Sequence, residues 1–254
     1  MAERKVVAIV QARMGSSRLP GKVLADLGGR PVLEWVLRRA GRAASIQQVM
    51  VATTINPEDD AVARFCKEAG YDCFRGSAFD VLDRYYRAAG AAGADVIVRL
   101  TGDCPLIDPG LLDAAVETFL AAEPPLDFAA NRLPGDRTVP IGLDTEICTR
   151  AALERAWAEA QQPHEREHVM PHFYEHPHDF NILHMRHEPD YGHYRWTVDT
   201  PEDLELLRQV VAHFDDDTFS WMDVLELFEQ QPELAELNAG VQHRDQTHVD
   251  ERHG

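Results

Sequence analysis

The sequence contains no long apolar run, and this absence excludes a transmembrane protein. No stretch of the 254 residues approaches the roughly 20 apolar residues that a membrane-spanning helix needs. The apolar segment 6–10 is too short for the core of a signal peptide. We therefore expect a cytoplasmic protein without a membrane partner.

Cysteine is also scarce. The chain has four cysteines, at positions 66, 73, 104 and 148, and no two of them form a C-x-x-C pair. A protein stapled by disulfides has more cysteines in a shorter chain. The cysteine count therefore indicates a reduced compartment and a fold stabilised by its apolar core.

Positive charge is scarce overall but is concentrated near the N-terminus. The chain has 25 Lys and Arg against 43 Asp and Glu, a formal charge of −18, which excludes a general nucleic-acid binder. Residues 1–50 nevertheless carry nine Lys and Arg and three acids, whereas residues 199–236 carry one Arg and twelve acids. Such a distribution indicates that the first fifty residues bind a small anion.

Short apolar strands alternate with amphipathic helices in the first half of the chain. The predicted strands are 6–10, 49–53, 71–74 and 95–100, and the predicted helices are 31–40, 57–69, 81–92 and 111–122. After residue 125 the pattern weakens to strands at 181–185 and 194–198 and helices at 149–160, 165–175, 201–214 and 221–228. This order predicts an α/β fold with a Rossmann-like, mostly parallel sheet and helices on both faces.

No Gly/Ser linker and no internal repeat divides the chain. We therefore expect a single domain over residues 1–241, with a small inserted sub-domain at about 126–195 that shapes a second binding site. The polar, His-rich segment 242–254 is expected to be a loose tail.

Residues 11–22, with the sequence Q-A-R-M-G-S-S-R-L-P-G-K, follow the first predicted strand directly. In an open α/β sheet, ligands bind at the carboxyl ends of the strands. Three cations, two hydroxyls and two glycines at this edge suit a triphosphate, which needs many donors at once. The spacing fits neither the Walker A loop nor G-x-G-x-x-G. A solvated basic loop is the alternative.

Two carboxylates are expected at the same edge of the sheet. Asp103 follows the strand 95–100, and Asp199 lies in the segment V-D-T-P-E-D-L between a predicted strand and a helix. Asp199 is also a candidate helix cap, but Thr200 can cap this helix with Pro201 at its first position. Thr200 therefore leaves Asp199 available for another role.

The loop closely resembles the A-R-x-x-S-x-R-L-P-G-K signature of sugar-activating cytidylyltransferases, such as CMP-Kdo and CMP-sialate synthetases. Its Q-A-R-M-G-S-S-R form is most similar to the spore coat polysaccharide branch of that superfamily. The resemblance spans residues 5–210 and includes G-D-x-P at 102–105 and V-D-T-P-E-D-L at 198–204. It implies a nucleotide-diphospho-sugar transferase-like fold, a homodimer, and transfer of CMP from CTP. The acceptor would be a sugar acid or a phosphorylated sugar or polyol that serves as a surface polysaccharide precursor.

The resemblance also implies roles for single residues. The expected catalytic residues are Lys22, Arg13 and Asp103, and the expected ligands of Mg²⁺ are Asp103 and Asp199. Nucleotide contacts are expected from Ala12, Arg13, Gly15, Ser16, Ser17, Arg18, Lys22, Arg75 and Arg84. Acceptor contacts are expected from Asn131, Asp144, Arg166 and His168. The chain departs from the Kdo enzymes at Thr101, where they carry a glutamine that contacts the base.

Three other functions fit parts of the sequence. His164, Glu165 and His168 match H-E-x-x-H, which would indicate a zinc hydrolase with Glu165 as general base. The run at 215–217 contains the D-x-D string of glycosyltransferases. A non-catalytic nucleotide-binding subunit is the third alternative. Of the remaining charges, we expect Arg38, Arg39 and Arg42 on the wet face of a helix, and most acids of 199–236 at the surface.

Overall fold

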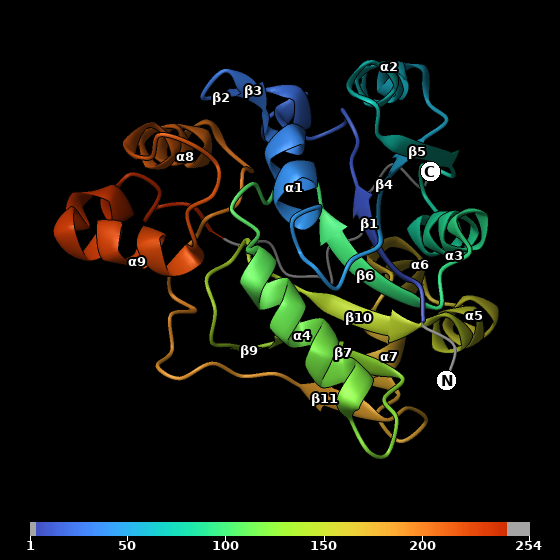
Figure 1. Ribbon diagram of the computed structural model, residues 1–254. Coiled ribbons are helices and arrows are strands. Elements are labelled where there is room, and N and C mark those ends of the chain that lie inside the picture. The colour runs from blue at the N-terminus through green and yellow to red at the C-terminus, as the bar shows by residue number, and fades with distance from the viewer. Residues whose placement is uncertain (1–3, 243–254) are drawn as a thin grey trace.

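The computed structural model describes residues 4–242, which fold around one seven-stranded sheet (Figure 1). In spatial order the strands are β11 (Ile182–His184), β7 (Phe128–Ala130), β10 (Glu146–Thr149), β6 (Val96–Thr101), β1 (Val6–Gln11), β4 (Gln48–Thr54) and β5 (Asp72–Gly76). Strand β10 pairs antiparallel with β6 and β7, and the other four pairings are parallel. The prediction of a mostly parallel sheet is confirmed.

Helices cover both faces of this sheet because its strands are apolar on both sides. In β1, Val6, Ala8 and Val10 pack on one face, while Val7 and Ile9 pack on the other. The first face carries α1 (Val32–Ala40), α2 (Asp60–Ala69) and α4 (Pro109–Ala121). The second carries α3 (Val81–Ala92), α5 (Arg150–Glu159), α6 (Pro163–His168) and α7 (Pro171–Glu175). Such a sheet is buried on both faces, as a parallel sheet requires.

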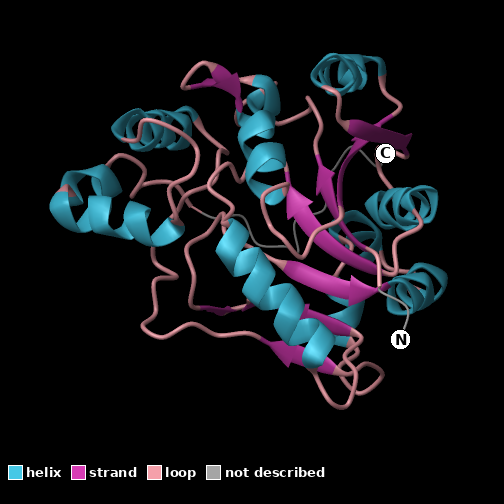
Figure 2. Cartoon of the chain, in the orientation of Figure 1, coloured by secondary structure: helices cyan, strands magenta, loops and turns pink. Residues whose placement is uncertain are grey.

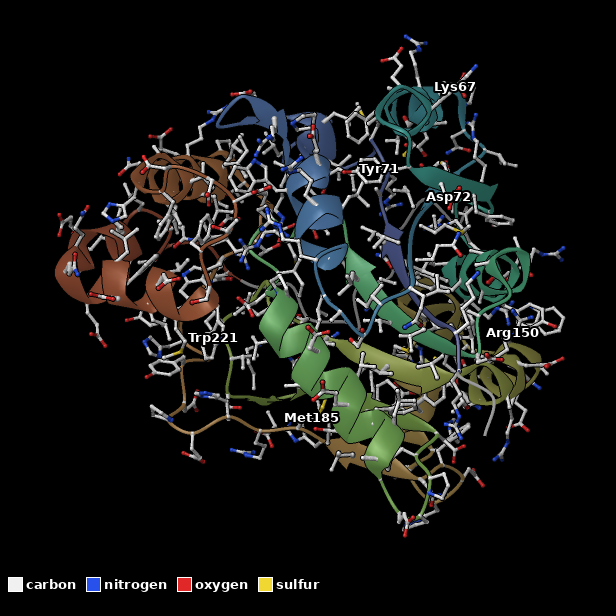
Figure 3. The ribbon with its side chains drawn as sticks, viewed as in Figure 1. Lys67, Tyr71, Asp72, Arg150, Met185 and Trp221 are labelled. Carbon is white, nitrogen blue, oxygen red and sulfur yellow. The ribbon has the colours of Figure 1, made fainter. Side chains whose placement is uncertain are left out.

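A third layer lies beside the sheet rather than on it (Figure 2). It contains α8 (Pro201–His213), α9 (Trp221–Gln230) and the 3₁₀ segment η3 (Pro232–Glu236), which share an apolar cluster with the outer side of α1. Trp221, labelled in Figure 3, starts α9 and donates its backbone N–H to Asp108 Oδ2 at 2.9 Å. Through the shared apolar cluster, the acidic C-terminal part packs against the basic N-terminal part.

Shorter elements fill the connections. They are the hairpins β2 (Asp26–Leu27) with β3 (Arg30–Pro31) and β8 (Arg132–Leu133) with β9 (Asp136–Arg137), and the 3₁₀ turns η1 (Lys22–Leu24) and η2 (Pro57–Asp59). The segment 126–195 supplies three strands, β7, β10 and β11, to the central sheet. Of the expected tail 242–254, all but Gln242 lies outside the described residues. Within residues 4–242, no helix has the length and apolar character needed to cross a bilayer.

The strand predicted at 194–198 is wrong. This segment forms an isolated bridge between Ile141 and Arg195, and Trp196 donates its N–H to the carbonyl of Ile141 at 2.7 Å. Its apolar residues are buried because they pack under α8 and α9, not because they join the sheet. The apolar pattern of residues 194–198 therefore reflects burial and not pairing within the sheet.

The expected wet face of α1 is wrong for Arg39. Its side chain is fully buried, its guanidinium donates to the carbonyls of Ile107 and Asp217 at 2.8 Å each, and it lies 4.5 Å from the ring centroid of Phe219. The Asp217 carboxylate, also buried, forms ion pairs with Arg30, Arg38 and Arg42. We call Asp217 and these four arginines the Asp217 cluster.

Candidate active site at the carboxyl edge of the sheet

The basic loop leaves β1 at the carboxyl edge of the sheet, and its backbone is held by specific bonds. Gly21 donates its N–H to the carbonyl of Met14 at 2.9 Å, which closes the loop. Met14 in turn donates its N–H to Oδ1 of the buried Asp59 at 2.6 Å. These bonds give the backbone of the basic loop a defined conformation.

At the end of this loop, Lys22 lies between the two predicted metal ligands. Its Nζ donates to Asp103 Oδ2 at 2.5 Å and to Asp199 Oδ1 at 2.7 Å. Burial alone would lower the pKa of Lys22, but the two carboxylates outweigh burial and raise it, so this amine stays charged. Three residues from distant parts of the chain therefore meet at one point.

Asp199 is held by further cations on its other oxygen. Arg18 Nη2 lies 2.9 Å and Arg195 Nη2 lies 2.6 Å from Asp199 Oδ2. Burial alone would raise the pKa of Asp199, but Lys22, Arg18 and Arg195 hold it well below its ordinary value. Asp199 is therefore an ionised carboxylate at any physiological pH.

The backbone fixes Asp103 against the segment that leads to Asp199. Val198 donates its N–H and Thr197 its hydroxyl to the carbonyl of Asp103, at 2.8 and 3.1 Å. Gly102 allows the loop after β1 to come close, because a Cβ there would lie 3.0 Å from the Ala12 Cβ and the Gln11 carbonyl oxygen. The glycine of G-D-x-P thus permits the close approach of the two loops.

The cap predicted for α8 is confirmed. The Thr200 side chain accepts the N–H of Asp203, and Asp203 accepts the N–H of Thr200, which forms a capping box. Because Thr200 caps the helix, the side chain of Asp199 is left to contact Lys22, Arg18 and Arg195.

A buried pair behind Asp199 was missed at the sequence level. Arg195 donates to both carboxylate oxygens of the fully buried Asp203, at 2.9 and 3.1 Å, and Asp203 also accepts the N–H of Asp199 at 3.0 Å. Asn238, beyond η3, donates to Asp203 Oδ1 at 2.9 Å and to the Arg195 carbonyl at 3.0 Å. The second acid of V-D-T-P-E-D-L was a signal for this pair, while Asn238 carried none.

The other expected nucleotide contacts lie around the same edge. In the loop, Ala12 is buried, Arg13, Gly15 and Ser16 are partly buried, and Ser17 is exposed. Ser16 Oγ accepts the N–H of Leu19 at 3.3 Å and so stabilises the turn that carries Arg18.

Arg75 and Arg84 hold the backbone near the end of β5. Arg75 donates to the carbonyls of Thr54 and Asn56 and pairs with Asp60 at 2.7 Å. Arg84 donates to the carbonyl of Ser77 at 2.6 Å and is 2% exposed, so its side chain does not lie on the solvent side of α3. Burial lowers the pKa of Arg84 to about 10.

Of the four expected acceptor residues, Asn131 and Asp144 lie close together in the structure. The buried Asn131 amide donates to the carbonyl of Leu143 and accepts the N–H of Thr145, both at 2.8 Å, and so clamps the backbone on either side of Asp144. The Asp144 carboxylate accepts hydrogen bonds from Nη1 and Nη2 of Arg137. Asn131 therefore positions Asp144.

Arg166 has a different environment. It pairs with Asp80, the N-cap of α3, at 2.5 Å and donates to the carbonyl of Trp157 at 2.6 Å. His168 is partly buried at the end of α6. These bonds tie α6 to α3 and α5.

The H-E-x-x-H pentapeptide does not provide a zinc-peptidase site. Glu165 closes the capping box of α6 and lies 2.6 Å from His172 Nδ1, whereas His164 pairs with Glu175 at 2.9 Å. The D-x-D string is also engaged otherwise, since Asp217 is buried in the Asp217 cluster and Asp216 accepts the N–H of Thr218 at 2.7 Å. Both strings matched by residue type but not by geometry.

Known proteins are similar to this chain in sequence and fold. The family model described as "Cytidylyltransferase" matches residues 7–244. The chain is 32% identical over 210 residues to the spore coat polysaccharide biosynthesis protein SpsF of Bacillus subtilis, covering 80% of this chain and 85% of that one. It is 31% identical over 251 residues to a 3-deoxy-manno-octulosonate cytidylyltransferase of Anaeromyxobacter dehalogenans, covering 82% and 98%. A solved cytidylyltransferase of Leptospira borgpetersenii superimposes with a TM-score of 0.89 at 38% identity, covering 95% and 100%.

Proposed function

The chain belongs to the cytidylyltransferase family, and on this premise we propose that it transfers CMP from CTP to a sugar acid or a phosphorylated sugar or polyol. Members of the family are CTP-dependent nucleotidyltransferases, so the enzyme class predicted from the loop is confirmed. The names of its relatives support a role in activating a precursor of a surface polysaccharide. One observation carries the proposal: Lys22, Asp103 and Asp199 meet at the carboxyl end of β1 and β6.

The loop 12–22 is the proposed triphosphate site. Arg13, Ser17, Arg18 and Lys22 supply the charges and donors, and the backbone held by Asp59 supplies N–H groups. Arg75 and Arg84 are the proposed contacts on the β5 side. Because Thr101 stands where the Kdo enzymes have glutamine, specificity for cytosine is the part of this proposal that needs direct measurement.

The two carboxylates fit a divalent metal. A single cation, the Lys22 ammonium, already reaches both of them, so their oxygens are close enough to share one charge. Carboxylate oxygens are the ligands that Mg²⁺ prefers, with water and phosphate completing its octahedron. We propose Asp103 and Asp199 as the Mg²⁺ ligands. When bound, the metal polarises the α-phosphate. The buried Arg195–Asp203 pair keeps Asp199 oriented for this role.

In the proposed reaction, an acceptor oxygen attacks the α-phosphorus of CTP in line, and pyrophosphate leaves toward the loop. The bond between the α-phosphorus and the bridging oxygen breaks, and negative charge develops on that oxygen. Lys22 and Arg13 stabilise this charge. Lys22 therefore exchanges its carboxylate partners for the triphosphate during the cycle. No protein nucleophile takes part.

The proposed acceptor site adjoins Asp144. A carboxylate held by Arg137 and positioned by Asn131 can accept hydrogen bonds from acceptor hydroxyls, while the nearby Arg132 and Arg137 favour an acidic acceptor. Arg166 and His168 remain predicted acceptor contacts, with Arg166 reaching the acceptor by exchanging Asp80 for its acidic group.

A screen of pyrophosphate release tests the function. Purified protein with Mg²⁺ and CTP is offered a panel of sugar acids, sugar phosphates and polyol phosphates, and then UTP, ATP and GTP replace CTP. We expect release with CTP and an acidic acceptor. Preference for another nucleotide would overturn the cytosine assignment. CTP binding without turnover on any acceptor would support the non-catalytic alternative.

A further inference from the structure

Three metal-binding side chains outside the proposed active site come together where α6 meets α7. Glu165, His172 and His176 each place one ligand atom within 4.8 Å of the other two, and within residues 4–242 this is the one group of three or more His, Cys, Asp or Glu that does so. Glu165 belongs to the pentapeptide that the transferase function leaves unused. Its partners here are residues that the sequence pattern did not indicate.

Glu165 is fixed in the orientation that a metal ligand needs. Its Oε2 accepts the backbone N–H groups of Gln161 and Gln162, at 3.0 and 2.8 Å, and its Oε1 faces His172 Nδ1 at 2.6 Å. The residue is 3% exposed. One carboxylate oxygen is therefore held by two backbone N–H groups, and the other lies against the ring of His172.

The two histidines have matching arrangements. The buried His172 has its second ring nitrogen, Nε2, 3.5 Å from Glu159 Oε2. His176 Nδ1 lies 3.0 Å from the carbonyl oxygen of His172, and a hydrogen bond donated there leaves a lone pair on its Nε2. The ring centroids are 4.4 Å apart. Each imidazole therefore has one nitrogen oriented by an oxygen and one for a metal, as is usual for metal-bound histidines.

We propose that Glu165 Oε1, His172 Nδ1 and a ring nitrogen of His176 bind a divalent cation of the zinc class, with water as the fourth ligand. Two imidazoles and one carboxylate suit Zn²⁺ and its neighbours rather than Mg²⁺. Any hydrogen on His172 Nδ1 leaves as the metal binds, and the neutral ring then carries its hydrogen on Nε2, where Glu159 accepts it. Ligands of a tetrahedral zinc lie roughly 3.3 Å apart, so the 2.6 Å contact of Glu165 with His172 widens by less than about 1 Å.

A metal ion bound at this site would connect α6 to α7 and stabilise their packing. These helices have six and five residues, too short to be stable without tertiary contacts. A cation that binds the folded chain and not the unfolded one adds stability in proportion to RT ln(1 + [L]/Kd). The proposal does not depend on the transferase activity, and its test does not use that activity.

Zinc titration of the metal-free, full-length protein tests the site, with stoichiometry read from competition with a chromophoric chelator and Tm measured alongside. His176→Ala removes an exposed ligand, and His178→Ala, an exposed histidine two residues away, is the matched control. We expect His176→Ala to bind one zinc equivalent fewer than the parent chain and to lose the zinc-induced rise in Tm. His178→Ala should keep both. Histidines 243, 248 and 253 are common to all three proteins and cancel in the comparison.

A second variant tests the supporting carboxylate. Glu159→Gln changes a half-exposed side chain, so we expect the variant to fold. It should weaken zinc binding about 10- to 100-fold, as expected for a carboxylate that supports a ligating histidine. Equal stoichiometry in the parent, His176→Ala and His178→Ala would overturn the proposal, as would loss of the equivalent in His178→Ala. Displacement of zinc by millimolar Mg²⁺ would overturn the assigned metal class.

Discussion

Two places in this molecule join the basic first fifty residues to the acidic C-terminal part, and they differ in what surrounds them. At the proposed active site, Lys22 and Arg18 meet Asp199, whose side chain is 16% exposed. In the Asp217 cluster, arginines from β3, α1 and the turn after α1 meet Asp217, whose side chain is 5% exposed. Both contacts pair N-terminal cations with C-terminal acids.

The difference lies in the supporting groups. In the Asp217 cluster, the guanidinium of Arg39 lies against the ring of Phe219 and donates to two backbone carbonyls. Because this group is buried, a ligand in solution does not contact it. Lys22 contacts only partly buried carboxylates at the open edge of the sheet. Similar residue types thus perform a structural role in one place and a proposed catalytic role in the other. Position relative to the carboxyl ends of the strands separates them.

The largest expected effect is that of Lys22→Met. We expect kcat to fall about 1,000-fold, because the variant loses the ammonium that stabilises the leaving pyrophosphate. Tm should change little. The measurement is pyrophosphate release with the acceptor found in the screen. Lys67→Met, an exposed lysine of α2 labelled in Figure 3, is the control and should keep parental activity. A Lys22→Met enzyme with most of its activity would make the active-site half of the comparison wrong.

Asp103→Asn is expected to lower kcat about 100-fold and to raise the Mg²⁺ concentration that gives half-maximal rate. The amide keeps the size of the side chain but cannot supply an anionic oxygen to the metal. Rates measured over a range of Mg²⁺ concentrations check this prediction, with Asp215→Ala as an exposed acidic control. An unchanged Mg²⁺ dependence would remove Asp103 from the metal site.

Asp217→Ala should show the opposite pattern. Removing the shared acid breaks its ion pairs with Arg30, Arg38 and Arg42, whose side chains are partly exposed, and this costs about 1–2 kcal/mol of folding free energy. For a chain of this size, Tm should fall by about 2–8 °C. The kcat and the KM for CTP, measured below the lowered Tm, should stay near the parental values. A selective loss of activity at unchanged Tm would contradict the division of roles between the two clusters.

The smallest expected effect is that the loss of Tm in Asp217→Ala depends on pH. Burial alone would raise the pKa of Asp217, but Arg38, Arg42 and Arg30 outweigh burial and hold it below its ordinary value. A carboxyl whose pKa is lowered by folding stabilises the fold fully above its unfolded pKa, about 3.9, and loses this contribution as pH falls through its folded pKa. The Tm difference between the parent and Asp217→Ala should therefore be constant from pH 7 to about 5 and narrow below about pH 4. A constant difference down to pH 3 would contradict the ion pairs.

The sequence predicted the parts of this architecture that depend on local pattern. Helix α3 has the predicted bounds and the cap at Thr200 forms. The loop meets Asp103 because the parallel strands β1 and β6 end at one edge, whereas Asp199 reaches the same place through a segment outside the sheet. What failed depended on distant partners. Arg39 looked like a surface residue until Asp217, Ile107 and Phe219 surrounded it. Charge patterns in sequence specify the number of ions but not their neighbours.

At the H-E-x-x-H pentapeptide as well, the sequence pattern did not identify the residues that come into contact. Helical spacing alone indicated His164 and His168 as partners of Glu165. The capping box instead directs this carboxylate toward His172, seven residues further on, across the turn between α6 and α7. The expected homodimer and the boundaries of the inserted sub-domain stay predictions, to be checked by solution mass measurement and limited proteolysis.

The hydrogen bond from Lys22 to Asp199 joins residues that are 177 positions apart in the chain. The hydrogen bond from Asn238 to Asp203 joins residues 35 positions apart. Closing such long loops costs conformational entropy, which the packing around them must offset. During synthesis, the first 198 residues contain the complete basic loop and Asp103 but not Asp199. A chain of that length therefore lacks one of the two proposed metal ligands.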